Sequence, residues 1–540
     1  MENLKRKEFL KKATLLTVAT AFIPDFLFAK SCPKKSGLFD RVVTNADDQG
    51  DYRIVDLHCH PSLKMYLWSQ HLWKCHLPGP GANEIQMQDD LRQLGYGNLK
   101  GLVVAHYLVE AATKRDWNLL KGLFPWINRF LHGLADKIEH EDASNFTQIN
   151  IMMDLLESQV HEVNQRQDTL KLVIARSYGE FLSASQVKGQ VAIAHAIEGG
   201  HALGRNFPIS ETREQEFKDK PAKQHKMITF EKREDPAFYY LRNLEALYNR
   251  GVCMITLAHI FKNDLAHPVE GISEDEKKTL GMTWHYDTAK HNCDLSAIGV
   301  AVAKRMLELG MVIDLTHSTP AARKNIFEIT AQVNEERVKL FDWVPDPVNP
   351  GSKIKRFKHK RPLTFTHVGS QQIFMKHNHM EALQAYKFYD IDDFEIDQIC
   401  ETEGVIGIIP ENFWLTGADK KISGEGIEPG DYRYGINYII DTMISINSKT
   451  RKKDFSNIAI GTDFDGFADA PKDLYVPKQL AALIEAIRKI PGITSGQVLA
   501  ITSGNANRLL ARGWGDKMDA VNIRPVTLVG TCEDDLTVKN

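Results

Sequence analysis

Short β-branched and apolar runs recur along this chain, and segments with helical periodicity separate them. Such runs lie at 53–57, 101–105, 191–196, 252–257, 312–315, 363–365, 405–409 and 457–460, and they predict eight strands. Continuous apolar runs of this length are typical of strands covered on both faces, as in a parallel sheet. Strands alternating with helices favour an α/β fold, a (β/α)8 TIM-type barrel with helical and loop insertions. A doubly wound open sheet is the alternative, although no GxGxxG motif follows a predicted strand.

Two of the intervening helices have clear sequence signals. Over 295–309 the apolar residues fall on one helical stripe, and Gly310 stands where a helix would end. In the segment HSTPAARKNIFEI, Ser318 or Thr319 can cap a helix whose first residue is Pro320. Both helices would lie between neighbouring barrel strands.

Histidines and carboxylates follow six of the eight predicted strands. They are His58 and His60 in DLHCH, Glu198 in IEGGH, His259 in LAH, His317 in DLTH, His367 in FTH and Asp463 in GTDFDG. Residues two apart on an extended strand share a face, so His58 and His60 project side by side. The carboxyl ends of barrel strands converge on one mouth, where barrel enzymes assemble their catalytic groups. One buried histidine is usually structural, whereas this recurrence predicts a shared site.

The residue types indicate metal chemistry. Imidazole and carboxylate together suit zinc or a similar divalent ion, and no thiolate set accompanies them. Five ligands (His58, His60, Glu198, His317 and His367) exceed one open tetrahedral site and suit two ions, with Glu198 as the bridge. A hydroxide held between the ions would be the nucleophile. Asp463 could accept its proton and pass it to a leaving amine.

Several motifs together resemble a known family. DLHCH, IEGGHAL, GVCMITLAH, LELGMVIDLTH, LTFTH, GVIGI, IAIGTDFDG and SGNANRLLA are similar, in this order, to segments of the membrane (renal) dipeptidase family of the amidohydrolase superfamily. The resemblance runs from about Ile54 to Arg512, with gaps. Each motif is weak alone, and their order and spacing carry the specificity.

The resemblance implies a (β/α)8 barrel that holds two zinc ions and cleaves dipeptides to amino acids. By motif matching, His58 and His60 would bind the first zinc ion, Glu198 would bridge, and His317 and His367 would bind the second. His259 matches a histidine that contacts the substrate and the tetrahedral intermediate, and Asp463 matches the catalytic acid/base. Relatives of this family also make a homodimer an expectation.

The chain departs from the family pattern at two positions of the site. The family has His-x-Asp after the first strand, where this chain has His58 and His60. The family also has an arginine after the sixth-strand histidine that binds the substrate carboxylate. No arginine follows His367 in the matching segment, and Lys376 or Lys387 would lack the bidentate fork. Two alternatives therefore stay open: another amide or lactone hydrolase, and a non-catalytic binding protein on the same barrel.

The ends of the chain differ from the barrel. Residues 1–31 begin with a basic stretch followed by a short apolar run, which is typical of an export signal and too short to span a bilayer. We expect an exported protein, periplasmic or at the cell surface, with Cys32 where a lipid-anchored cysteine could stand. The expected barrel covers 50–515, with insertions at about 110–180 and 335–360, and a C-terminal tail covers 516–540.

Charge and hydropathy narrow the classes of partner, and the cysteine spacing bears on disulfide bonding. The net charge of −3 argues against a nucleic-acid partner, and the basic runs 353–361 and 451–453 are interpreted as solvated loops. No segment after residue 31 is apolar enough for an integral membrane span. Seven scattered cysteines form no CxxC pair, so we expect most of them to be buried small hydrophobic residues. The expected partner is a small-molecule substrate.

Overall fold

The computed structural model describes most of the expected barrel and little of the two chain ends. It describes residues 30–31, 51–76, 86–108, 144–166, 169–204, 236–269, 292–349, 351–377, 386–411, 415, 435–466, 470–471, 473–526 and 528. Apart from residues 30–31, which form β1 (Lys30–Ser31) beside β3 (Lys74–Cys75), the predicted export signal and Cys32 lie outside these residues. Export and lipid attachment therefore stay predictions.

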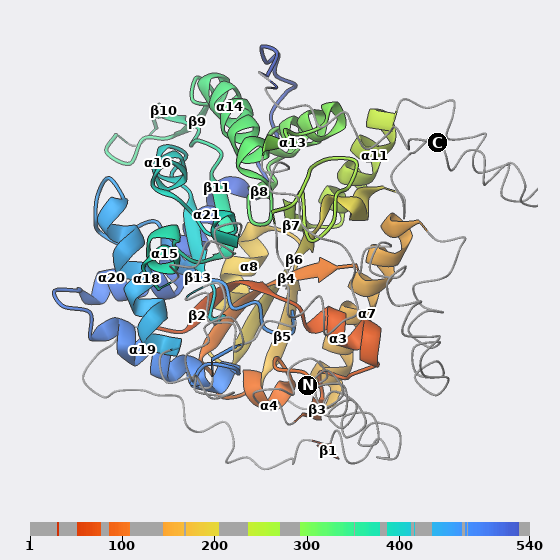
Figure 1. Cartoon of the computed structure of the whole chain (residues 1–540), viewed down its shortest axis with the longest axis vertical. Helices are drawn as coiled ribbons and strands as arrows, with labels where there is room; N and C mark the ends of the chain where they lie inside the picture. Colours follow the sequence, from red (N-terminus) through yellow and green to blue (C-terminus); the bar gives the residue numbers. More distant parts are fainter. Residues whose placement is uncertain are drawn as a thin grey trace, which may run out of the picture.

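A closed barrel of eight parallel strands forms the centre of the molecule (Figure 1). The strands are β2 (Ile54–Cys59), β4 (Leu99–Tyr107), β6 (Gln190–Glu198), β7 (Val252–Thr256), β8 (Val312–Asp314), β11 (Leu363–Val368), β12 (Val405–Ile408) and β13 (Ile458–Ile460). Their spatial order is β4–β2–β13–β12–β11–β8–β7–β6, and β4 pairs with β6 from Gly101 to Tyr107 to close the ring. The predicted (β/α)8 barrel is confirmed.

A ninth parallel strand, β5 (Lys171–Ala175), was not predicted from the sequence. It pairs with Gln190–Ala194 in the first part of β6, and β7 pairs with the following His195–Glu198. The run KLVIA is as apolar as the barrel strands, but it lies within the segment expected to be an insertion. Hydrophobicity alone does not distinguish a barrel strand from an additional strand at its edge.

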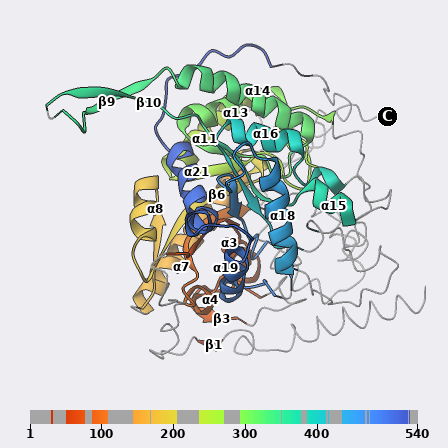
Figure 2. The ribbon, with the colours of Figure 1, turned by 90° about the vertical axis from the view of Figure 1, so that its left-hand side faces the viewer.

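Helices surround the barrel and return the chain from the end of one strand to the start of the next (Figures 1 and 2). They are α3 (Pro61–Trp68), α4 (Leu91–Leu94), α7 (Asn145–Arg166), α8 (Tyr178–Ser185), α11 (Pro236–Asn249), α13 (Ala297–Leu309), α14 (Pro320–Arg337), α15 (Gln371–His377), α16 (Asp393–Glu401), α18 (Gly435–Lys449), α19 (Leu480–Arg488), α20 (Ser495–Leu499) and α21 (Asn505–Gly513). Short 3-10 turns are η1 (Gly200–Leu203), η4 (Tyr386–Phe388) and η5 (Pro477–Gln479), and a π-helical turn, η6 (Ala500–Gly504), precedes α21. Within the described part of the chain, no helix is both long and apolar enough to cross a bilayer.

The two helices with clear sequence signals are present, with the predicted stop at Gly310 and the predicted start at Pro320. Ser296 caps α13 by accepting a hydrogen bond from the Gly299 amide, and Gly310 ends the helix in the left-handed conformation at φ 81°. Thr319 caps α14, and Pro320 is its first residue. Thr319, rather than Ser318, is therefore the cap.

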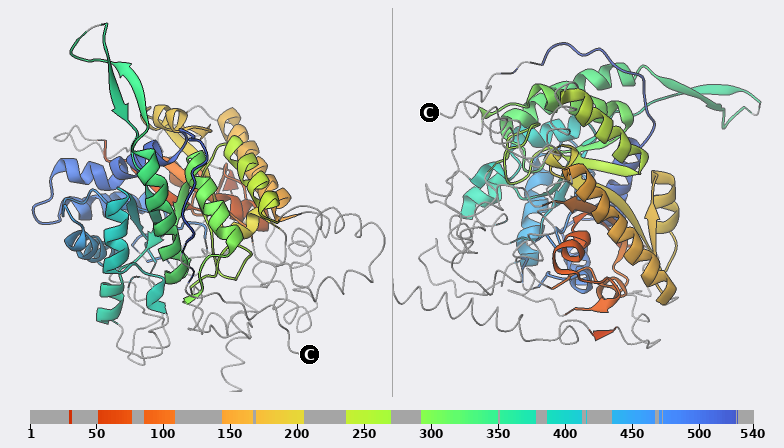
Figure 3. Two further views of the ribbon diagram at one scale, coloured as in Figure 1. Left: turned by 90° about the horizontal axis from the view of Figure 1, so that it is seen from above. Right: turned by 90° about the vertical axis from the view of Figure 1, so that its right-hand side faces the viewer.

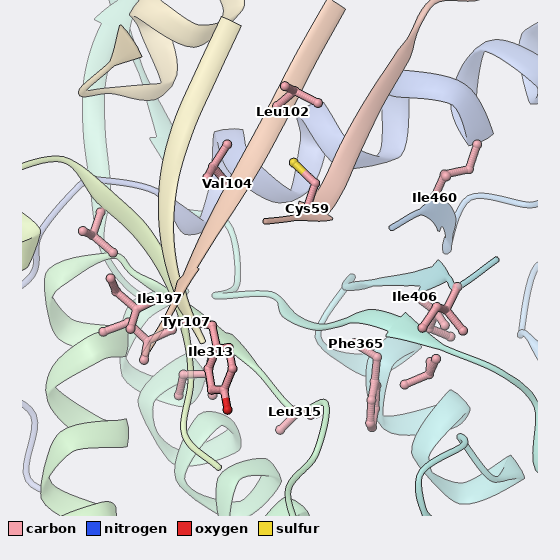
Figure 4. Close-up of a cluster of buried hydrophobic side chains, with 14 of the residues drawn as sticks. Cys59, Leu102, Val104, Tyr107, Ile197, Ile313, Leu315, Phe365, Ile406 and Ile460 are labelled. Carbon is pink, nitrogen blue, oxygen red and sulfur yellow. The ribbon is translucent and has the colours of Figure 1, made fainter. Parts of the chain in front are cut away.

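Apolar side chains pack the strands against the helices. Figure 4 shows part of this buried cluster, with Ile313, Phe365, Ile406 and Ile460 contributed by four neighbouring strands. A second cluster joins small residues of β6 to Leu509 and Leu510 of α21. Because each helix buries an apolar face on the barrel, the strand ends that carry the polar residues are held on a rigid frame.

The tail after α21 lies along the barrel, and Arg361 holds it there. The buried Arg361 guanidinium donates to the carbonyl oxygens of Leu307, Arg512, Gly515 and Asp516 at 2.5–3.2 Å. These contacts tie the start of the predicted tail to α13 and to the segment before β11.

Both predicted insertions are only partly described. In the first insertion, residues 109–143 lie outside the described residues, and α7 begins at Asn145. The segment 335–360 contains an antiparallel hairpin of β9 (Phe341–Pro345) and β10 (Lys353–Phe357). The expected solvated loop at 353–361 is thus partly a strand, because the cross-strand pairing organises residues that look loop-like in sequence.

The cysteines fall into two groups. Cys59 and Cys253 are free and buried, as predicted, and Cys400 is free and partly buried. Cys75 and Cys293 are buried and disulfide-bonded, and the sequence analysis did not single out either of them for a disulfide. Linear spacing does not reveal which cysteines meet in a fold.

Candidate metal centre

The seven residues singled out in the sequence meet at the carboxyl ends of the barrel strands. His58, His60, Glu198, His259, His317, His367 and Asp463 come from six strands or the loops that follow them. Their ligand atoms form three overlapping groups within metal-binding reach: His58, Glu198 and His367; His58, His60 and Asp463; and Glu198, His259 and His317. All except Asp463 are buried.

Glu198 lies at the centre of the cluster. Its Oε1 atom is 3.2 Å from Nε2 of both His58 and His317 and 3.5 Å from Nε2 of His367. Its Oε2 atom is 3.3 Å from Nε2 of His60 and of His259. A carboxylate with imidazoles on both oxygens has the position that the sequence predicted for a bridging ligand.

The histidine pairs show why a cation fits the centre. Nε2 of His58 lies 2.9 Å from Nε2 of His60, and Nε2 of His317 lies 3.1 Å from Nε2 of His367. The buried Oε1 atom of Glu198 has no aligned hydrogen-bond donor among the described residues. A buried carboxylate and facing nitrogen lone pairs are costly without positive charge between them. The donor set therefore suits one or more divalent ions with nitrogen and oxygen ligands.

Asp463 lies at the open side of the cluster. Its Oδ1 atom is 3.1 Å from Nε2 of His60, and its side chain is 15% exposed, against 2% for His60 and Glu198. Its amide donates to the carbonyl of His58 at 2.9 Å, which ties the loop after β13 to β2. Asp463 can thus contact both the centre and an entering substrate.

Two residues of the cluster have a strained backbone. His317 and Asp463 have φ angles of 66° and 53°, in the left-handed region that few side chains adopt. A Cβ atom at Gly466 would lie 2.0 Å from Oδ1 of Asp463, so only glycine fits beside this carboxylate. Strained residues persist where the surrounding structure over-determines them, and they cluster at functional sites.

Thr366 orients two of the histidines. Its hydroxyl oxygen lies 3.0 Å from Nδ1 of His58 and 2.8 Å from Nδ1 of His367, and the hydroxyl donates to Asp314 at 2.5 Å. Because the single hydroxyl hydrogen points to the Asp314 carboxylate, the oxygen accepts a hydrogen bond from each Nδ1–H group. Both rings therefore present Nε2 to the centre, which is the orientation that a metal ligand needs.

Two buried aspartates fix the strand ends that carry the histidines. Asp314 also accepts hydrogen bonds from the hydroxyls of Thr256 and Thr316, at 2.8 and 2.7 Å. Asp56, which lies behind His58 as the strand periodicity predicts, accepts bonds from the amide and hydroxyl of Thr462 at 2.9 and 2.6 Å. These bonds connect neighbouring strands and hold the histidines at fixed positions.

The electrostatics of the cluster favour a bound cation. Burial lowers the pKa of His58, but the adjacent Glu198 carboxylate outweighs burial and raises this pKa to about 9. Burial would raise the pKa of Glu198, yet His259 and His58 hold it well below its usual range. Burial raises the pKa of Asp56 to about 6 despite the bonds from Thr462. A proton thus occupies His58 near neutral pH when no metal is bound, so metal binding at this ring would release a proton.

Aromatic rings line the centre. The ring of Tyr107 lies 4.2 Å from that of His259, and the ring of Tyr389 lies 5.2 Å from that of His317. Lys376, on α15, is exposed, and the Lys387 ammonium lies 5.1 Å from the centre of the Phe388 ring. The structure shows neither lysine in contact with the metal-ligand cluster.

Thr366→Val should weaken metal binding without removing a ligand. The variant keeps the side-chain shape but leaves both Nδ1–H groups without their acceptor, so we expect metal affinity to fall by about 10–100-fold. Competition with a chromophoric chelator measures this affinity. Thr366→Ser retains the hydroxyl and should stay close to the parent protein. Equal affinities for the valine variant and the parent protein would show that Thr366 does not orient the ligands.

Sequence reasoning did not identify Thr366, Asp314, Tyr107 or Tyr389. A threonine directly before His367, in the motif FTH, was the one local signal for Thr366. Its contact with His58 joins residues 308 positions apart, which only the closed barrel brings together.

Comparison with known proteins finds similar solved structures but no matching sequence family. No family model and no curated protein matches the sequence. Among solved structures, a metallopeptidase of family M19, the dipeptidase AC, matches with a TM-score of 0.50 and 14% identity, over 86% of this chain and 99% of its own. A metallopeptidase from Rhodobacter sphaeroides, bound to a phosphinate mimic of the dipeptide L-Ala-D-Ala, gives the same values.

A third solved structure agrees with these two. The probable dipeptidase PvdM from Pseudomonas aeruginosa matches with a TM-score of 0.52 and 15% identity, over 86% of this chain and 96% of its own. At these identities the likeness concerns the fold. The chain shares its fold with these three proteins.

Proposed function

We propose that this protein is an exported metal-dependent hydrolase of the membrane dipeptidase family that cleaves amide bonds, with dipeptides as its substrates. The observation that carries the proposal is the convergence of five histidines on the buried Glu198 carboxylate, with Asp463 beside His60. The similar fold of two metallopeptidases, one of them a dipeptidase, and of a probable dipeptidase supports it. The two bonded cysteines, Cys75 and Cys293, are consistent with export to an oxidising compartment.

The proposed ligands form two sets around one bridge. His58 and His60 would hold one zinc ion, His317 and His367 would hold the second, and Glu198 would contribute to both. Bound divalent ions supply positive charge that polarises a substrate carbonyl and acidifies water. Thr366 keeps His58 and His367 oriented toward Glu198.

Two side chains would handle the substrate and the proton. Asp463 is the most exposed acid of the cluster, so its carboxylate can take a proton from the attacking water and deliver it to the leaving amine. His259 lies against Tyr107 at the edge of the cluster, where its imidazole can donate to the oxygen that gains negative charge. Burial of the remaining residues excludes bulk water from them.

That the substrate is a dipeptide, and not another amide, is the more specific part of the proposal. Neither Lys376 nor Lys387 is seen at the cluster, and the rings of Tyr107 and Tyr389 lie beside it. Hydrolysis of another amide or of a lactone is therefore the second candidate. It shares the metal centre and differs in how the substrate is held.

Metal quantification combined with a substrate screen tests the proposal. We expect about two equivalents of zinc in the purified protein and hydrolysis of at least one class in a panel of dipeptides, N-acyl amino acids and lactones. Chelation should abolish this activity, and zinc should restore it. Bound metal without turnover of any class would instead favour a binding protein on the same barrel. Full activity of metal-free protein would refute the proposal.

A further inference from the structure

The β9–β10 hairpin projects from the molecule on the side away from the metal centre. It connects the end of α14 to the start of β11, so it lies at the amino ends of the barrel strands, whereas the centre lies at their carboxyl ends. Figures 2 and 3 show the two strands extending beyond the surrounding helices. The hairpin can therefore contact a large partner without covering the centre.

One face of the hairpin combines aromatic rings with lysines. Phe341 stands opposite Phe357, Trp343 opposite Lys355 and Pro345 opposite Lys353, and residues directly opposite on paired strands share a face. The Phe341 ring lies 5.6 Å from the Trp343 ring and 5.7 Å from the Phe357 ring. The Lys355 ammonium lies 4.2 Å from the centre of the Phe341 ring. We call this set of Phe341, Trp343, Lys353, Lys355 and Phe357 the aromatic–lysine face.

The apolar residues of the hairpin are unusually exposed. Trp343 is 58% exposed, Phe357 57% and Val348, at the tip, 79%. In the described part of the chain, six of the twelve large hydrophobic residues that are exposed lie between Val338 and Phe357. Scattered exposed apolar residues are ordinary on a protein surface, but a concentration of them marks a surface that binds a partner.

The charges of the hairpin define that partner. Lys353 and Lys355 lie on the aromatic–lysine face, which carries no carboxylate. Asp342 lies on the other face and pairs with Lys358 at 2.6 Å, and Asp346 accepts hydrogen bonds from Val348 and Asn349 within the tip. The carboxylates of the hairpin are thus already engaged. A partner that covers this face must supply negative charge.

A second copy of the chain does not meet this requirement. A two-fold dimer through the hairpin would place the same patch of each copy against the other, and would bring lysines toward lysines. A flat anionic lipid surface accepts tryptophan and phenylalanine at the level of its head groups and attracts lysine ammonium groups. We propose that the aromatic–lysine face docks the protein on membranes that contain anionic phospholipids.

Vesicle co-sedimentation of the full-length protein tests this docking. The parent protein should sediment with vesicles of phosphatidylcholine and phosphatidylglycerol and remain soluble with phosphatidylcholine alone. Lys353→Gln with Lys355→Gln should weaken binding by about 30-fold, since each lysine near an anionic surface contributes about fivefold. Trp343→Ser should weaken it by about tenfold through lost apolar burial.

Matched variants separate docking from general surface effects. Phe238→Ser removes an aromatic residue of similar exposure (55%) on α11, and Lys452→Gln with Lys453→Gln neutralises two exposed lysines of the other basic run. Both should bind vesicles as the parent protein does. Thermal melting by circular dichroism checks that every variant is folded, independently of any enzymatic activity.

Three results would overturn the proposal. The first is the absence of sedimentation with anionic vesicles, and the second is equal binding by the Trp343 variant and the parent protein. The third is a dimer in sedimentation velocity that Trp343→Ser dissociates, because the face would then bind a second copy of the chain.

Discussion

Glu198→Gln should empty the metal centre. Both oxygens of the Glu198 carboxylate face histidine Nε2 atoms at 3.2–3.5 Å, and an amide lacks the negative charge that would offset divalent ions in a buried site. We expect metal affinity to fall by more than about 100-fold, beyond the loss typical of residues that only orient ligands. Hydrolysis should fall to background under the same conditions. Elemental analysis after dialysis, together with a turnover assay, measures both effects.

A second buried glutamate provides the control. Glu395 on α16 pairs with Arg323 at 2.9 Å and is outside the centre. Glu395→Gln should lower the free energy of unfolding while leaving the metal content unchanged. If Glu198→Gln still carried two ions after dialysis, Glu198 would not be the bridging ligand.

Asp463→Asn should separate proton transfer from metal binding. The amide has the shape of the carboxylate but cannot accept a proton, and general acid/base groups contribute about 10²–10⁴-fold to turnover. We therefore expect kcat to fall by about that factor while the metal content is unchanged. Steady-state kinetics on the substrate found in the screen, with metal analysis of the same sample, tests this.

Asp465, in the same loop, provides a control for the Asp463 variant. Asp465 accepts hydrogen bonds from the amides of Gln88 and Asp89 at 2.7 and 3.2 Å, so Asp465→Asn should affect loop stability more than chemistry. Substantial turnover by Asp463→Asn would remove its acid/base role. Loss of one ion would instead make Asp463 a ligand, which its place beside His58 and His60 permits geometrically.

Local sequence patterns predicted the barrel and its polar strand ends. Each of the eight predicted strands is present, because continuous apolar runs reflect burial on both faces and do not depend on distant contacts. The helix cap at Thr319 and the stop at Gly310 depend on equally local signals, whereas the cap at Ser296 was not predicted. The strand β5 was not predicted. Its apolar run lies in the segment expected to be an insertion, and hydrophobicity does not indicate that this run pairs with the first part of β6.

The hairpin and the disulfide-bonded cysteines needed the tertiary structure. In the segment 335–360, prolines and charges suggested a loop, whereas pairing between Phe341–Pro345 and Lys353–Phe357 organises it as two strands. Cys75 and Cys293 gave no spacing signal for a bonded state. The cross-strand pairing of the hairpin and the bonded state of these cysteines belong to the folded chain, and local composition does not indicate them.

The sequence alone determined that imidazoles and carboxylates follow six parallel strands, since strand ends are marked by apolar runs and residue type is explicit. Only the tertiary structure decided how closely the five histidines approach the Glu198 carboxylate, that Thr366 orients His58 and His367, and that Asp463 is the more exposed acid. The physical reason is that these relations depend on distances between different strands. Those distances exist only once β4 pairs with β6 and the barrel closes.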